Sequence, residues 1–104
     1  MIDHLTPTGP ALAASASVTF KTANRSLAVG DRLVLFSDGL PEATNGNGEF
    51  FCDEKIERAM REHADTAAQN LVRAIMDKVV EFEDGAPRYD DITCVGVVYR
   101  GPTA

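Results

Sequence analysis

The sequence has no tryptophan, only two cysteines and only two histidines. Cys52 and Cys94 form no C-x-x-C pair, and His4 and His63 each stand alone, so the spacing argues against a zinc site. One disulfide is compatible with the count, but two reduced thiols are the simpler interpretation. We therefore expect a cytoplasmic protein with free thiols.

Basic residues are also few. The chain carries 10 Lys and Arg against 16 Asp and Glu, for a formal net charge of -6, and no Lys/Arg run occurs. Neutralising the phosphates of a nucleic acid requires a basic patch, so nucleic acid is excluded as an expected partner. An acidic chain can instead hold metal cations where its carboxylates converge.

Long hydrophobic runs are missing as well. No apolar stretch approaches the ~18 residues of a membrane-spanning helix, so no membrane association is expected. Residues 1–17 lack the basic and apolar regions of a signal peptide. The composition, 44% hydrophobic and 25% charged, is that of a globular protein. A chain of 104 residues is one small domain or part of one.

Three segments have the pattern of β-strands. Residues 18–21 alternate apolar and polar side chains, which predicts a short half-buried strand. Residues 32–36 are apolar on both faces after Arg32, and residues 91–99 are rich in β-branched side chains on both faces. Both patterns predict strands that are covered on both sides.

Two segments have helical periodicity. The first is expected from Asp53, as N-cap, to about residue 62 or 63, and the second spans about 66–82. Thr66 and Gln69 fit a capping box at the start of the second helix. Gly85 and the proline two residues later are expected to end it.

The predicted order is strand, strand, helix, helix, strand. It favours an α+β fold in which a mostly antiparallel sheet carries a helical hairpin on one face. Two helices can cover only one face of a sheet, yet two strands are apolar on both faces. Something else should therefore cover the second face.

Acidic residues mark two strand ends. Asp38-Gly39 closes the strand of 32–36, and Asp90-Asp91 opens the strand of 91–99. If these strands are antiparallel neighbours, the three carboxylates approach one another, and a divalent cation would relieve their repulsion. Taken singly, Asp-Gly is also a common turn, and Asp90-Asp91 is also compatible with a solvated start of a strand.

Other candidate motifs fail on spacing. Residues 45–49 are better interpreted as a flexible loop with tight turns than as an EF-hand, because Phe50 occupies the sixth position and Ile56 the twelfth. Ser37 lies in no G-x-S-x-G elbow and has no histidine placed to activate it, which argues against a serine hydrolase.

Taken together, two stretches resemble a known family. "LAVGDRLVLFSDGLPEATNGNGEFF" and "YDDITCVGVV" are similar to the C-terminal half of metal-dependent (PPM-type) protein serine/threonine phosphatases. The resemblance is to the bacterial branch typified by the sporulation stage II E phosphatase and by stress-response phosphatases that act on anti-sigma-factor antagonists. The matching positions are Leu27, Gly30, Asp31, Leu33, Ser37, Asp38, Gly39, Leu40, Glu42 and Asn45, then Asp90, Asp91, Ile92 and Thr93.

The resemblance implies a phosphoprotein phosphatase with an α-β-β-α sandwich fold. Asp38 and Asp90 match metal ligands, and two Mn²⁺ or Mg²⁺ ions would activate the water that attacks a phosphoserine or phosphothreonine. Gly39, Asp91 and Thr93 would support the site. A phosphoprotein in bacterial signalling is the implied substrate.

Two departures from the family pattern stand out. The family's first half, with an aspartate that bridges both metals, is missing, and Cys52 replaces the usual glycine. We therefore expect residues 1–104 to form a single partial domain, inactive in isolation and self-associating through its uncovered sheet. The alternatives are a non-catalytic regulatory or interaction module, and an unrelated α+β protein whose acidic motifs are turns.

Overall fold

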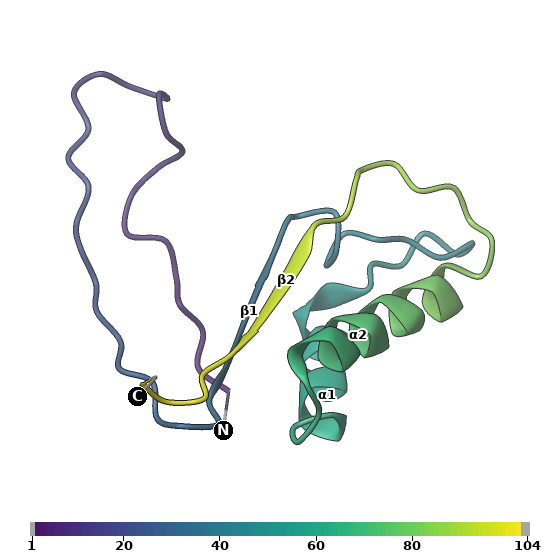
Figure 1. The fold of residues 1–104 in the computed structure, drawn as a ribbon. Coiled ribbons are helices and arrows are strands. Elements are labelled where there is room, and N and C mark those ends of the chain that lie inside the picture. Colours follow the sequence, from purple (N-terminus) through teal and green to yellow (C-terminus); the bar gives the residue numbers. More distant parts are fainter. Residues whose placement is uncertain (1, 103–104) are drawn as a thin grey trace.

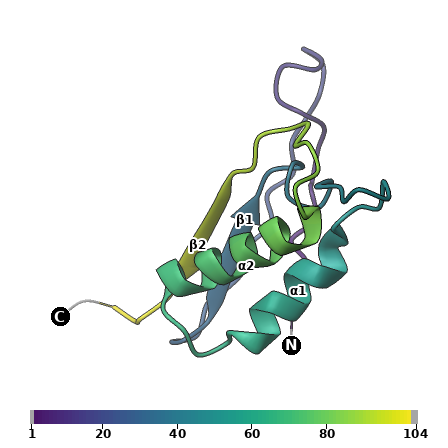
Figure 2. The same ribbon diagram turned by 90° about the vertical axis from the view of Figure 1, so that its right-hand side faces the viewer.

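The computed structural model describes residues 2–102. Its elements, in chain order, are β1 (Arg32–Phe36), α1 (Cys52–Glu62), α2 (Ala68–Glu83) and β2 (Cys94–Val98). The two strands pair antiparallel, and both helices lie on the same side of them (Figures 1 and 2). The predicted α+β arrangement is confirmed. Neither helix has the length and apolar character needed to cross a membrane.

One face of the sheet packs against the helices. The register pairs Val34 with Gly96 and Phe36 with Cys94, and the side chains of Val34 and Cys94 reach the hydrophobic core. Gly96 lies directly under α2, because a Cβ atom there would be 2.9 Å from a methyl carbon of Val72. The missing side chain lets α2 approach β2 closely.

The opposite face of the sheet remains largely open. Leu35, Val95 and Val97 alternate with the helix-facing residues and are 50%, 49% and 41% exposed. Both strands were predicted to be covered on both faces. The helices cover one face, and the prediction is wrong for the other. The residues of this second face are apolar, as in a buried sheet, but no helix within the described residues covers them.

The core joins the helices to the segment between β1 and α1. From that segment Leu40, Ala43 and Phe51 are buried, and the Phe51 ring meets Phe82 edge-on at 5.4 Å. The helices add the other members of the cluster, which are Ile56, Ala59, Leu71, Ile75 and Val79. Sequence periodicity identified the helical members but not the three loop residues, because a loop has no repeat to follow.

The predicted strand at residues 18–21 is wrong. Residues 18–21 lie in a long excursion of the chain away from the sheet and belong to neither strand (Figure 1). Phe20 packs over Gly9 instead, and the Thr8 hydroxyl donates a hydrogen bond to the carbonyl of Lys21. Alternation of polar and apolar residues also occurs in an extended segment that packs on its own neighbours.

The predicted start of the first helix is off by two residues, because Phe51 and not Asp53 precedes α1. Asp53 lies in the first turn of α1 and does not cap it. The amide of Phe51 donates to the carbonyl of Ala43 (2.7 Å), and the amide of Cys52 donates to that of Pro41 (2.8 Å). Backbone carbonyls thus satisfy donors that would otherwise need a capping side chain.

The predicted capping box of the second helix is also wrong. The Thr66 hydroxyl donates to the carbonyl of His63 (2.8 Å), within the turn between the helices. Ala67 precedes α2, and no side chain caps this helix. The C-terminal end agrees with the prediction, since the chain turns left-handed at Asp84 and Gly85. The second strand starts later than predicted, at Cys94.

Cys52 adopts a backbone conformation that favours glycine. Its φ angle is +67° at the start of α1, and it occupies the position where the resembling family usually has glycine. A side chain in this region costs ~1–2 kcal/mol. The departure from the family pattern therefore places strain at the junction between the loop and α1.

We predict that Cys52→Gly stabilises the chain by about 0.5–1 kcal/mol. Relief of the left-handed conformation outweighs the ~0.4–1 kcal/mol lost to the greater freedom of the unfolded chain. Urea unfolding monitored by circular dichroism measures the difference. Cys52→Ala is the matched control, because it removes the thiol but keeps Cβ, and it should leave stability nearly unchanged. Equal stabilisation by both variants would contradict the strain.

Candidate active-site edge at the end of the sheet

The two acidic motifs lie side by side at one end of the sheet. Beyond the last pair of the strands, the amide of Ser37 donates to the carbonyl of Thr93 (2.9 Å). The amide of Thr93 in turn donates to the Ser37 hydroxyl oxygen (2.9 Å). These bonds place Asp38 next to the residues that precede Thr93, as the antiparallel arrangement predicts. We call residues 37–39 and 90–93 the acidic edge.

Gly39 makes the closest approach within the acidic edge. A Cβ atom at this position would lie 2.9 Å from the carbonyl carbon of Asp91, closer still to its oxygen, and 3.4 Å from the carbonyl oxygen of Asp90. Gly39 is buried, and any side chain would push the two motifs apart. Gly39 is therefore needed for close packing and not only for a turn.

The three aspartates of the acidic edge are exposed to solvent. Within residues 2–102, no group of three or more His, Cys, Asp or Glu side chains is arranged to hold a metal ion. The edge thus offers carboxylates of the kind that Mg²⁺ and Mn²⁺ accept, but this stretch of the chain does not supply a complete ligand set.

Buried side chains and local turns hold the Asp38 side of the edge. The amide of Leu40 donates to the carbonyl of Ser37 (3.0 Å), and that of Glu42 donates to the carbonyl of Asp38 (3.1 Å). Leu40 itself is fully buried in the core. Asp38 therefore lies at the corner of a turn that is anchored within two residues.

An ion pair holds the chain that leads to the other side of the edge. Glu83, at the end of α2, is 6% exposed, and its carboxylate accepts two hydrogen bonds from the Arg88 guanidinium, at 3.0 and 2.5 Å. The hydrogen bonding with Glu83 raises the pKa of Arg88 further above its ordinary value. This pair restrains the connection two residues before Asp90. Sequence reasoning missed both residues, because no local pattern marks a pair formed across a turn.

The cysteines do not belong to the acidic edge. Both are free thiols, as predicted. Cys94 is half-buried against the core, and burial raises the pKa of its thiol, which favours the neutral form. Cys94 therefore acts as a small packing residue.

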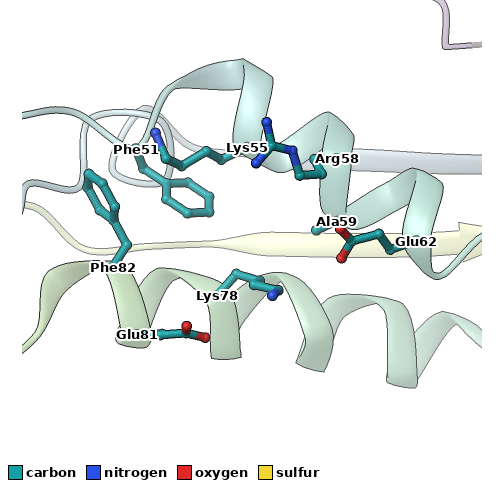
Figure 3. A pocket seen from close by; sticks show the side chains of 8 residues that line it. All are labelled: Phe51, Lys55, Arg58, Ala59, Glu62, Lys78, Glu81 and Phe82. Carbon is teal, nitrogen blue, oxygen red and sulfur yellow. The ribbon is translucent and has the colours of Figure 1, made fainter.

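A groove lies between the helices. Phe51, Ala59 and Phe82 line this groove of about 240 Å³, together with charged side chains from α1 and α2 (Figure 3). The Lys55 ammonium lies 4.9 Å from the centre of the Phe82 ring. The other charged residues of its lining are Arg58, Glu62, Lys78 and Glu81. The two signs are mixed, so the groove favours no single ligand charge.

Comparison with known proteins supports the resemblance. The profile of the family Stage II sporulation protein E (SpoIIE) matches residues 2–100. The phosphoserine phosphatase RsbU of Bacillus subtilis is 32% identical over 87 residues, which are 84% of this chain and 25% of RsbU. The protein IcfG of Synechocystis is 27% identical over 97 residues, which are 93% of this chain and 15% of IcfG.

A solved structure shows the same fold. The SiaA-PP2C domain of Pseudomonas aeruginosa superposes with a TM-score of 0.72 at 23% identity. The match covers 80% of this chain and 34% of that structure. This chain therefore spans a quarter or less of the length of the two curated relatives, and about a third of the structural neighbour.

The fold of the described residues agrees with that of the structural neighbour. The profile match extends over nearly the whole chain, from the segment before β1 to the residues after β2. The chain belongs to the family Stage II sporulation protein E (SpoIIE).

Proposed function

We propose that this chain contributes one part of the catalytic centre of a metal-dependent phosphatase that acts on phosphoserine or phosphothreonine in a protein substrate. The proposal rests on the acidic edge, where Gly39 packs against the backbone of Asp90 and Asp91. Membership in the SpoIIE family supports it. RsbU, a relative, is named as a phosphoserine phosphatase. A phosphoprotein of bacterial signalling, such as an anti-sigma-factor antagonist, is the proposed substrate.

Asp38 and Asp90 are the proposed metal ligands. Their oxygens suit Mn²⁺ or Mg²⁺, which prefer hard ligands and retain waters. When bound, two such ions supply an activated water and neutralise charge on the phosphoryl group. Gly39 keeps the two motifs close together, while Asp91 and Thr93 support the edge through their backbone groups.

The acidic edge is proposed to be an incomplete centre. No set of three ligand side chains is found in the region that the structure covers, and the aspartate that bridges both metals in the family has no counterpart in the sequence. We propose that residues 1–104 form a partial domain, inactive alone and completed by another segment or chain. The alternative is a non-catalytic interaction module, which would bind its partner through the same open sheet face.

The first test is metal binding. Titration with Mn²⁺ should broaden the amide NMR signals of Gly39 and Asp91 before those of α2, because a paramagnetic ion relaxes nearby nuclei. Asp38→Asn and Asp90→Asn should each raise the Mn²⁺ concentration for half-broadening about tenfold or more, since an amide lacks the carboxylate charge. Asp77→Asn, on α2 and exposed, is the control. Equal broadening in all four proteins would contradict the assignment.

The second test is activity. The isolated chain with Mn²⁺ should show no hydrolysis of p-nitrophenyl phosphate above the same chain with Asp38→Asn, because a two-metal centre without its bridging ligand does not hold both ions. Turnover at about 1–1,000 per second, the range of typical enzymes, would overturn the proposed inactivity.

The third test concerns the open sheet face. We predict reversible self-association, measured by sedimentation velocity over a concentration series, because burial of Leu35, Val95 and Val97 removes apolar surface from water. The double variant Val95→Thr/Val97→Thr should shift the chain toward monomer. Val80→Thr, at an exposed position on α2, should not. A wild-type chain that stays monomeric at high concentration would refute the prediction.

A further inference from the structure

Ser37 replaces one bond of the β-ladder with its side chain. In the antiparallel register, Ser37 and Thr93 follow the last strand pair, Phe36 with Cys94. An antiparallel bonded pair exchanges two backbone hydrogen bonds. One of these two bonds is present, from the Ser37 amide to the Thr93 carbonyl. In place of the other, the Thr93 amide donates to the Ser37 hydroxyl oxygen at 2.9 Å and not to the Ser37 carbonyl.

The Ser37 carbonyl takes part in the following turn instead of the ladder. The carbonyl accepts the amide of Leu40 at 3.0 Å and thereby closes the turn that contains Asp38 and Gly39. The Ser37 carbonyl thus serves the turn, while the Ser37 hydroxyl serves the strand pairing. The hydroxyl allows both to exist one residue after β1.

The same hydroxyl also reaches the second acidic motif. Its proton is donated to the carbonyl of Asp91 at 3.3 Å, and that carbonyl is also the one against which Gly39 packs. One side chain thus connects β1, the turn at Asp38 and the backbone of Asp91, which lies 54 residues away in sequence.

From this geometry we infer that Ser37 is a positioning residue, whose hydroxyl holds Asp38 and the Asp90-Asp91 motif at a fixed separation. The inference rests on the proposed function, since it assigns Ser37 a role in forming the metal-binding edge. Alanine at this position would leave the Thr93 amide and the Asp91 carbonyl without this partner. Threonine would retain the hydroxyl.

Amide hydrogen exchange in the 104-residue chain tests the hydroxyl directly. In Ser37→Ala the Thr93 amide should exchange at least about tenfold faster than in wild type, because it loses its acceptor. The amides of Ile75 and Val79 in the middle of α2 should keep their protection from exchange. Ser37→Thr should protect the Thr93 amide as well as the wild-type chain does. A Thr93 amide equally protected in Ser37→Ala would overturn the inference.

The Mn²⁺ titration separates positioning from a purely local role in folding. Ser37→Ala should need several-fold more Mn²⁺ than wild type to broaden Gly39 and Asp91, and Ser37→Thr should match wild type. An unchanged Mn²⁺ dependence in Ser37→Ala would overturn the positioning role. If the wild-type chain itself shows no selective broadening, the proposed metal site fails, while the exchange of Thr93 still decides whether the hydroxyl holds the edge.

If Ser37→Ala does not fold, two proteins still decide the matter. The Thr93 amide must be protected in the wild-type chain and in Ser37→Thr. Exchange of that amide at the rate of an unstructured peptide in either folded protein would refute the hydrogen bond to the hydroxyl.

Discussion

The antiparallel pairing of β1 with β2 is the interaction on which the rest of the structure depends. It joins a strand before the helices to a strand after them, so the helical pair is enclosed within one loop of chain. The same pairing brings Asp38 and Asp90, which are far apart in sequence, to one end of the sheet. Without it, each acidic motif would be an ordinary turn.

The segment between β1 and α1 links this pairing to the core. Leu40, Ala43 and Phe51 are buried, and backbone bonds from Phe51 and Cys52 attach the start of α1 to the turn after Asp38. The acidic edge is consequently supported from below by packed side chains. A rigid support of this kind suits a site that must hold charged groups close together against their mutual repulsion.

One face of the two-stranded sheet has no covering layer within the described residues. Apolar side chains alternate along both strands, but helices cover only the face that bears Val34 and Gly96. The structural neighbour is about three times longer than the region matched here. In the partial domain proposed above, the uncovered apolar layer and the lack of a three-ligand cluster within residues 2–102 would have the same explanation.

Sequence reasoning succeeded where the pattern is local. The strand at 32–36 and both helices follow from hydrophobic periodicity, and the paired motifs around Asp38 and Asp90 identified the family. It failed at residues 18–21 and at both helix starts. An alternating segment needs a neighbouring strand in order to pair, and Ala43 and Pro41 supply the acceptors that a capping side chain would have supplied at α1.

By itself, the sequence determined the two helices, the strand at 32–36 and the positions of the acidic motifs at the strand ends, because each is encoded within a few neighbouring residues. Only the tertiary structure decided that Leu40 and Phe51 belong to the core and that Glu83 pairs with Arg88. It also decided that the Ser37 hydroxyl serves as an acceptor for Thr93, 56 residues away. These contacts depend on strand register and turn geometry, which local sequence patterns do not specify.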